Sequence, residues 1–300
     1  MALLKNMLNK VIIHQQIFII FSLFILIINF FSNIINSYTN YLIWIALFFV
    51  STLGVSHGAL DGKLIWRGIN KNFQRIILFT LYLILVLLGW SLWVSYPSIG
   101  LSVLLIMSIF HFGNSDLKFL KLSDRNIRLS WGFGMTFMPI LFKREVVDSI
   151  FYNLIGINIP DFLMVIIYCI LILSIIRIYF SLINNVINSK ANVVWFRDKN
   201  VLLILELTSL VILSCFTHPF IWFAIYFCGL HGIRSLIDSN FNWKIDLKWL
   251  SLFTLPVLVF IGFTYGRYWN VNSYSLIFPV LGSLTIAHMS LPSLLKFIKR

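Results

Sequence analysis

The chain has 300 residues, of which 60% are hydrophobic and only 11% carry a formal charge, and its mean hydropathy is +0.93. These values exclude an ordinary soluble domain, in which about 25% of residues are charged. The formal net charge of +13 does not indicate a nucleic-acid partner, because lysine and arginine gather in the cytoplasmic loops of membrane proteins. Apolar runs of about 20 residues, long enough to cross a hydrocarbon core, predict an all-α, polytopic transmembrane helical bundle.

We expect about ten membrane spans, with both termini cytoplasmic. The fifth span is short, and residues 143–160 are expected to lie in the interface or to re-enter the membrane. The first span lacks a small-residue cleavage site, so we expect it to be retained rather than removed as a signal peptide. The loops are too short for a soluble domain, so residues 1–300 are expected to form a single integral membrane domain. The approximate spans are 11–31, 41–61, 76–95, 99–117, 129–142, 161–182, 201–217, 219–238, 249–266 and 274–295.

The basic residues support this topology. Of the 23 lysine and arginine residues, only Lys143, Arg144 and Arg267 fall outside, and Arg177 lies within a span. The others fall in cytoplasmic segments, among them Lys63 after the second span and Arg234 at the inner end of the eighth. This bias is the pattern of a multi-pass protein and fits the inner membrane of a cell.

Four histidines are expected at a similar depth, on the second, fourth, eighth and tenth spans. These spans all run from outside to inside, and each histidine lies in the cytoplasmic half of its helix, within one to two turns of one level. Such imidazoles can converge in the bundle interior, where a mainly histidine shell with open positions suits non-haem iron or copper. The alternative is that each is a core residue hydrogen-bonded across helices. The predicted metal-binding and catalytic residues are His57, His111, His231 and His288.

Carboxylates follow three of these histidines. Asp61, Asp116 and Asp238 lie four, five and seven residues after the first three histidines, respectively. Metal-bound imidazole usually donates its other N–H to such an oxygen, so we expect these aspartates to orient the ligand rings. Only the first spacing places both side chains on one helix face, and the other two aspartates could equally be solvated boundary residues.

Glycines also lie one or two residues after three of the histidines, at Gly58, Gly113 and Gly232. Small residues allow helices to approach closely, and they would also leave room for a ligand beside a metal. The sequence does not separate these two explanations.

The other two histidines are expected to have different roles. His218 precedes His231 by 13 residues, about 20 Å along a helix, so the two cannot bind one metal ion. Because Pro219 follows it, we interpret His218 as a capping or interfacial residue at the outer end of the eighth span. His14, beside Gln15 at the cytoplasmic end of the first span, is interpreted as an interfacial residue.

The eighth span is unusually aromatic. Its rings could line a tunnel for an elongated apolar ligand, or they could serve packing and the interfacial aromatic belt. They belong to Phe220, Trp222, Phe223, Tyr226 and Phe227.

Several motifs resemble the Brp/Blh family, whose members are membrane-embedded β-carotene 15,15′-dioxygenases found beside microbial rhodopsins. They are HGALD (57–61), HFGNSD (111–116), FAIYFCGLHGIRS (223–235) and AHM (287–289). HGALD and the YFC…H segment are the specific signals, whereas HFG alone is weak. The resemblance runs in the same order from the second span to the last, so we expect a Brp/Blh-like core at 41–298 and an extra N-terminal span within 1–35.

The resemblance implies a non-haem Fe(II) enzyme that uses O₂ to cleave the central double bond of β-carotene into two retinals. It further implies a lipophilic carotenoid substrate within the lipid bilayer and a functional link to a microbial rhodopsin. His57, His111 and His231 match the iron ligands proposed for the family. The fourth would lie at Ser235, and serine is a poor Fe(II) ligand. Either His288 completes the shell, or three histidines and water suffice, or the activity has been lost or altered.

The sequence leaves other functions open. A non-catalytic accessory protein that binds retinal or a carotenoid for a rhodopsin would also tolerate serine at position 235. A transporter would show broken helices in repeated halves, and no internal repeat is evident. A membrane di-iron desaturase requires more than the six histidines present, paired in HxxxH and HxxHH clusters. The function favoured by the sequence is oxidative cleavage of a carotenoid at a histidine-bound iron.

Overall fold

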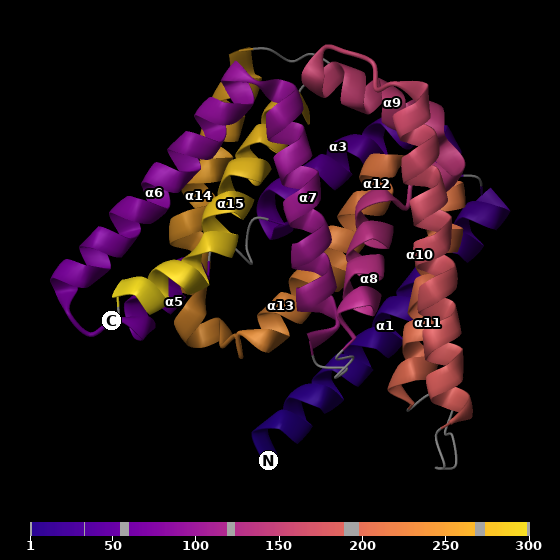
Figure 1. The fold of residues 1–300 in the computed structure, drawn as a ribbon, viewed down its shortest axis with the longest axis horizontal. Helices are drawn as coiled ribbons and strands as arrows, with labels where there is room; N and C mark the ends of the chain where they lie inside the picture. The colour runs from indigo at the N-terminus through magenta and orange to yellow at the C-terminus, as the bar shows by residue number, and fades with distance from the viewer. Residues whose placement is uncertain are drawn as a thin grey trace. The chain divides into compact units, whose positions relative to one another are not determined.

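The structure is a computed structural model that describes residues 2–32, 34–54, 60–118, 124–188, 198–267 and 274–298. All secondary structure in these ranges is helical (Figure 1), which confirms the all-α prediction. His57 and Gly58 lie outside the described residues, so their predicted roles stay predictions from the sequence.

The described chain forms α-helices interrupted by two π-helical segments, η1 and η3. In chain order the elements are α1 (Ala2–Ser32), α2 (Ile34–Ser37), α3 (Thr39–Phe49), η1 (Val50–Gly54), α5 (Asp61–Gly68), α6 (Asn72–Ser95), α7 (Pro97–Asp116), α8 (Arg125–Phe137), α9 (Ile140–Ile155), α10 (Asp161–Ile187), α11 (Lys199–Phe216), α12 (Pro219–Ala224), η3 (Ile225–Gly232), α13 (Ile233–Asp238), α14 (Trp243–Arg267) and α15 (Tyr274–Ile298).

Seven helical segments of the described chain are long and apolar enough to cross a membrane, and they match seven of the ten expected spans. They are Met7–Ser32, Asn72–Ser95, Pro97–Asp116, Asp161–Ile187, Lys199–Phe216, Pro219–Asp238 and Ile277–Ile298. The second expected span overlaps the shorter apolar helix Thr39–Leu53. The fifth corresponds to α8, which has only 13 residues, and the ninth lies within α14. The total of ten spans and the placement of the termini therefore stay predictions.

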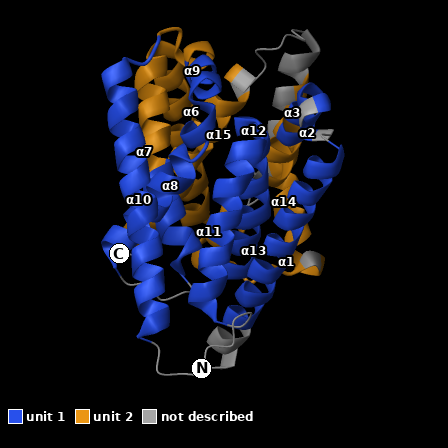
Figure 2. Cartoon of the chain, turned by 90° about the vertical axis from the view of Figure 1, so that its right-hand side faces the viewer, with its two compact units in different colours: residues 1–46, 108–151, 158–238 blue, residues 47–107, 152–157, 239–300 orange. Residues whose placement is uncertain are grey.

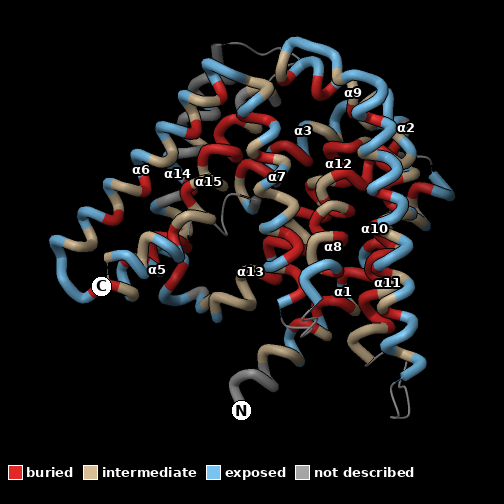
Figure 3. Tube along the Cα trace, in the orientation of Figure 1, coloured by how far each residue is buried: buried red, intermediate tan, exposed pale blue. Residues whose placement is uncertain are grey.

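Burial is distributed as expected for helices in lipid. Leu83 and Leu87 on α6 and Phe162 and Phe180 on α10 are large apolar side chains, and all four are exposed. Figure 3 shows the contrast between the largely exposed α10 and the largely buried α11 and α12. Apolar side chains that face outward in this number suit a hydrocarbon surrounding rather than water. The chain is a polytopic membrane protein.

Contacts divide the chain into two compact units, coloured separately in Figure 2. Unit 1 comprises Met1–Ala46, Ser108–Phe151 and Asn158–Asp238, and unit 2 comprises Leu47–Met107, Tyr152–Ile157 and Ser239–Arg300. In unit 1, α1 packs against α11, α13 and η3, while α10 packs against α8 and α11. In unit 2, α6 packs along α15. The expectation of one integral membrane domain over 1–300 remains a prediction.

The core of unit 2 is apolar where α5, α6 and α15 meet. Its buried cluster is formed by Ile65, Ile69, Leu78, Tyr82, Ala287 and Leu291. The small side chain of Ala287 lies in this cluster one residue before His288. The cluster therefore stabilises the helix that carries one of the predicted ligands.

Two glycines bring α7 and α8 into backbone contact within unit 1. A Cβ atom on Gly132 would collide with the carbonyl oxygen of Ile109, and one on Gly113 would collide with that of Arg128. Of the two explanations offered for Gly113 by the sequence, the structure supports close helix approach. This approach brings the Trp131 side chain of α8 to Asp116 of α7, where the two form a hydrogen bond.

A buried ion pair joins α5 to α14 in unit 2. Lys63 Nζ donates to Asp246 Oδ2 at 2.6 Å, and Arg67 contacts the other carboxylate oxygen at 3.2 Å. The Asp246 and Lys63 side chains are only 1% and 5% exposed. Lys63, expected in a cytoplasmic loop, is thus a buried partner rather than a solvated charge. Burial alone would raise the pKa of Asp246, but the Lys63 and Asn242 hydrogen bonds and the charges of Lys63 and Arg67 lower that pKa below its usual value.

Replacing Gly132 with alanine should prevent α7 and α8 from reaching their observed separation, because the added methyl group meets backbone atoms that cannot rotate away. We expect Gly132→Ala to yield little folded protein in detergent, measured by size-exclusion chromatography and thermal unfolding. Gly134→Ala is the matched control on the same helix, since a Cβ there meets nothing within 4 Å. Normal folding of Gly132→Ala would contradict the backbone contact.

Asp246→Asn should lower the thermal unfolding temperature strongly, because breaking a buried ion pair from one side costs about 3–5 kcal/mol. A carboxylate whose pKa is lowered by folding stabilises the protein above its unfolded-state pKa of about 4, and this stabilisation is lost as the pH falls through the folded-state value. The difference between wild type and variant should therefore be constant above about pH 5 and narrow below about pH 4.

Asp238→Asn provides the control, because Asp238 pairs with Lys118 at side-chain exposures of 36% and 58%. An exposed pair contributes about 1 kcal/mol or less. Equal destabilisation by the two asparagine substitutions would contradict the importance assigned to the Lys63–Asp246 pair.

Candidate functional site

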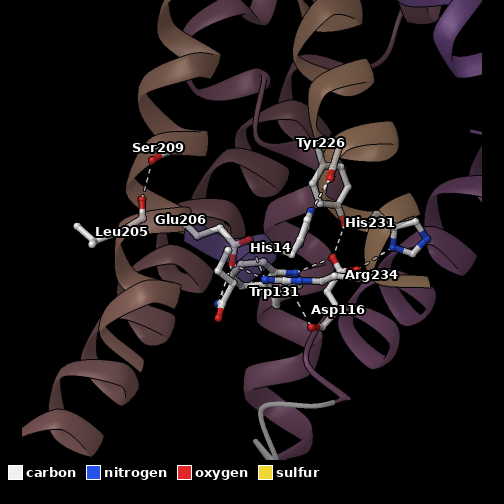
Figure 4. A network of polar contacts seen from close by, with 11 residues as sticks. His14, Asp116, Trp131, Leu205, Glu206, Ser209, Tyr226, His231 and Arg234 are labelled. Carbon is white, nitrogen blue, oxygen red and sulfur yellow. Dashed lines mark hydrogen bonds and ion pairs between the residues drawn. The ribbon is translucent and has the colours of Figure 1, made fainter. Parts of the chain in front are cut away.

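Asp116, the last residue of α7, collects three side-chain donors in the interior of unit 1. His231 Nδ1 lies 2.7 Å from Oδ1, while the Tyr226 hydroxyl and Trp131 Nε1 donate to Oδ2 at 2.7 and 3.0 Å. Figure 4 shows these three side chains directed at the carboxylate. Because the carboxylate accepts, the hydrogen of a neutral His231 ring resides on Nδ1 and the ring's lone pair on Nε2.

The π-helix η3 makes this arrangement possible. Tyr226 and His231 are five residues apart, and both contact Asp116. In an α-helix, residues three or four apart share a face, whereas a π-helix is built on contacts five residues apart. The π-helical backbone therefore directs both side chains to one carboxylate. Such segments are frequent at functional sites.

His111 lies against His231 from α7. Their Nε2 atoms are 3.1 Å apart, and the rings meet at 68°. Phe112 packs edge-on against the His231 ring, and Phe227 stacks on it with an interplanar angle of 6°. The aromatic rings limit rotation of the imidazole and surround it with apolar surface. The structure thus brings together two of the four predicted ligands, His111 and His231.

Asp116 also has a different partner from the one suggested by its position in the sequence. The spacing associates it with His111, but its carboxylate contacts His231 on another helix. Asp116 therefore orients a predicted ligand ring from a segment more than a hundred residues away.

A second layer of polar contacts surrounds Asp116. Arg234 is 1% exposed and donates from Nη2 to both carboxylate oxygens of Glu206 at 2.7 and 2.6 Å. Its Nη1 lies 3.4 Å from the backbone oxygen of Asp116. Gln15 Nε2 donates to Glu206 at 3.3 Å. Arg234, expected as part of the cytoplasmic charge bias, is therefore a buried member of the network in Figure 4.

The interfacial interpretation of His14 is wrong. Its side chain is buried, with 7% of the residue exposed, and its Nε2 lies 2.9 Å from the carbonyl oxygen of Gly229 in η3. The turn of α1 that carries His14 faces the protein because α1 packs on η3 and α13. The length and polarity of an isolated span could not reveal this partner.

Unit 2 contains a similar arrangement around Asp61. His288 Nδ1 lies 2.8 and 2.9 Å from the two Asp61 oxygens, and Tyr82 donates its hydroxyl hydrogen to Asp61 at 3.0 Å. Asp61 is almost completely buried, while the His288 side chain is 23% exposed. As with His231, the carboxylate fixes the hydrogen on Nδ1 and the lone pair of the neutral ring on Nε2. Asp61, associated by spacing with His57, thus orients His288.

The remaining predicted residues have other surroundings. Asp238 forms an ion pair with Lys118 at 2.7 Å near the surface of unit 1. Ser235 lies half-buried on α13, and Gly232 is buried at the end of η3. His218 confirms the capping prediction: it is the N-cap of α12, and its Nδ1 accepts from the Phe220 amide at 3.3 Å.

The aromatic residues of the eighth span pack mainly on one another and on the site. Trp222 stacks on Tyr226, and Phe223 stacks on Phe227. Tyr226 and Phe227 in turn contact Asp116 and His231. For these four rings the structure supports the packing explanation.

The two histidines are within hydrogen-bond distance of each other, and their separation also fits two ligands of one metal ion. Imidazole nitrogens lie about 2.0–2.1 Å from a bound zinc ion, so two such ligands at a right angle are about 3 Å apart. The observed Nε2–Nε2 separation is 3.1 Å. Among the described residues, no group of three or more His, Cys, Asp or Glu side chains is placed to bind a metal ion. The donor type and the Asp116 contact fit a metal ligand pair.

Sequence reasoning missed most of the residues that support the histidines. Tyr82 and Trp131 resemble ordinary aromatic residues of membrane helices and carry no distinguishing signal, and Tyr226 stands out only as one ring of the aromatic eighth span. Glu206 and Arg234 carried one, because ionisable residues within apolar spans are rare and usually paired or functional.

Comparison with known proteins agrees with the resemblance seen in the motifs. Residues 48–296 match the family described as BCD, Beta-carotene 15,15'-dioxygenase. A protein of an uncultured marine bacterium, 66A03, named Beta-carotene 15,15'-dioxygenase, is 27% identical over 269 residues, which cover 83% of this chain and 92% of that protein. No solved structure matches the chain. The matched segment contains all four predicted histidines, and the chain belongs to the beta-carotene 15,15′-dioxygenase family of carotenoid-cleaving dioxygenases.

Proposed function

We propose that this protein cleaves β-carotene, or a related carotenoid, with O₂ at the central double bond to give two retinals. In this reaction one C=C bond is broken, and each of its carbons receives one oxygen atom of O₂ as an aldehyde oxygen. The observation that carries the proposal is the His111–His231 pair, oriented by buried Asp116 within the family match. A carotenoid partitions into lipid, which suits a chain composed largely of apolar helices.

We further propose that Fe(II) binds to His111 and His231, with His288 and His57 as the other predicted ligands. His57 lies outside the described residues. Bound Fe(II) would supply the redox chemistry that the reaction of O₂ with a double bond requires. Ser235 is not among the proposed ligands, because a serine hydroxyl is a poor donor to Fe(II).

The chain's own residues have distinct tasks in this proposal. Asp116 accepts the Nδ1 hydrogen of His231 and so keeps Nε2 of that ring, which lies 3.1 Å from His111 Nε2, without a hydrogen and able to bind a metal ion. Asp61 does the same for the tautomer of His288. Tyr226 and Tyr82 restrain the two carboxylates by donating to them. Phe112 and Phe227 cover His231 and limit access of water to the ring. Excluding water from a reaction site prevents side reactions.

The alternative is a non-catalytic protein that binds retinal or a carotenoid for a rhodopsin. Serine at position 235 is the feature that favours it. Metal analysis of the purified protein separates the two functions: iron in stoichiometric amount supports the enzyme, whereas its absence after anaerobic reconstitution with Fe(II) supports the binding protein. A location in the inner membrane and a link to a microbial rhodopsin belong to either proposal.

His231→Ala should abolish retinal formation in a bacterial strain that makes β-carotene, because it removes a proposed ligand. Retinal and residual β-carotene are measured by chromatography after membrane expression has been verified. The control is His218→Asn, which retains an N-cap side chain. Burial and the nearby charge of Lys143 lower the pKa of His218 to about 4, so the histidine is neutral near pH 7 and the control removes no charge. Unchanged carotenoid in the strain expressing wild-type protein would refute the proposed activity.

Asp116→Asn should weaken Fe(II) binding about 10- to 100-fold, the usual effect of changing a residue that orients a metal ligand. The substitution preserves size but removes the negative charge opposite His231 Nδ1. Iron bound per protein is measured over a range of Fe(II) concentrations. Asp124→Asn serves as the control, because Asp124 is the exposed N-cap of α8 and asparagine caps a helix equally well. Equal iron affinity in the two variants would argue against Asp116 as the orienting group.

A further inference from the structure

The N-terminal helix α1 lies outside the segment that matches the family, which begins at residue 48. It is nevertheless part of unit 1, where it packs on α11, α13 and η3. A helix that served only as a membrane anchor would have no need of buried polar side chains, because these are costly in an apolar environment. Yet His14 and Gln15 of α1 are 7% and 0% exposed. The two residues reach the Asp116–His231 pair by separate routes.

The first route runs through the backbone of η3. His14 Nε2 lies 2.9 Å from the carbonyl oxygen of Gly229, two residues before His231. Because a carbonyl oxygen only accepts, His14 must carry its hydrogen on Nε2 and donate it. The contact falls inside the π-helical segment Ile225–Gly232, whose geometry places Tyr226 and His231 on the same carboxylate. His14 therefore stabilises the part of the backbone that sets the direction of His231.

The second route runs through Glu206 and Arg234. Gln15 donates to Glu206 Oε2 at 3.3 Å, and Glu206 accepts two hydrogen bonds from Arg234. Arg234 then extends to the backbone oxygen of Asp116 at 3.4 Å. All four residues are at most 1% exposed. Figure 4 shows His14, Glu206 and Arg234 in one polar network with Asp116, Tyr226 and His231.

We propose that His14 and Gln15 are positioning residues of the iron site, and that α1 completes this site although it lies outside the family match. The inference rests on the proposed function, because it assigns His231 to iron. Neither residue touches substrate or metal in this proposal. His14 acts through the Gly229 carbonyl on His231, and Gln15 acts through Glu206 and Arg234 on Asp116.

The test compares two substitutions of His14 in the full-length protein. His14→Phe preserves a planar ring but removes the N–H donor to Gly229, whereas His14→Gln retains a side-chain N–H donor. We expect the dissociation constant for Fe(II) to rise about tenfold in His14→Phe, at the lower end of the effects of residues that support metal ligands. In His14→Gln it should return to within about threefold of wild type. Metal binding is followed by anaerobic titration with Fe(II) and quantification of bound iron, independently of retinal formation.

Two further variants separate positioning from general destabilisation. Val11→Ala removes methyl groups from a fully buried position on the same helix, so it should lower the unfolding temperature without changing the Fe(II) dissociation constant. Gln15→Met removes the donor to Glu206 at nearly constant volume and should weaken Fe(II) binding in the same direction as His14→Phe. Its result still tests the proposal if His14→Phe does not fold.

The outcomes distinguish this inference from the proposed function. Weaker Fe(II) binding in His14→Phe, with recovery in His14→Gln, supports the positioning role. Unchanged affinity in both His14→Phe and Gln15→Met, with wild-type protein binding iron, overturns this inference alone. Equal loss in His14→Phe and His14→Gln also overturns it, because the donor would then be irrelevant. Wild-type protein that does not bind iron overturns the iron assignment and this inference together.

Discussion

The buried carboxylate of Asp116 is the constraint on which the arrangement of unit 1 depends. An isolated carboxylate in an apolar interior is strongly unfavourable unless hydrogen bonds and opposite charge compensate for the lost water. Here Trp131, Tyr226 and His231 donate to it, and they come from α8 and η3. All three donors must reach the same carboxylate. The relative positions of α7, α8 and η3 are therefore fixed, because any shift would leave Asp116 buried without its hydrogen bonds. The Gly113 and Gly132 contacts provide the close approach that this register requires.

Each unit contains one histidine with the same local chemistry. In both, a tyrosine hydroxyl donates to a buried aspartate, and the aspartate lies against Nδ1 of a histidine. A carboxylate in that position selects the tautomer with its lone pair on Nε2 and makes the ring a stronger electron donor. A metal ligand requires this tautomer, because only a nitrogen without hydrogen can donate its lone pair to a metal ion. The two carboxylates were associated by spacing with His57 and His111, yet they contact His288 and His231.

The polar groups of unit 1 also show how a membrane protein can contain charge. Glu206 and Arg234 neutralise each other with two short hydrogen bonds, and Gln15 contacts the same carboxylate. The hydrocarbon region contains no water that could solvate such groups, so ionisable side chains there are usually paired within the protein. Polar contacts therefore connect α1 and α11 to the end of α7. In unit 2, Lys63 of α5 and Asp246 of α14 form a buried ion pair in the same way.

The all-α membrane architecture, the family and the cap at His218 could be predicted from the sequence, because hydropathy, motif order and the His218–Pro219 pair are local properties. Length and composition also located the long apolar helices, and the motifs singled out His111, His231 and His288. The tertiary fold was needed to reveal which carboxylate meets which histidine, since Asp116 and His231 are 115 residues apart. It also decided that His14 and Arg234 are buried and that η3 is π-helical. These features depend on how helices face one another, because the partners of His14, Arg234 and Asp116 come from distant segments of the chain.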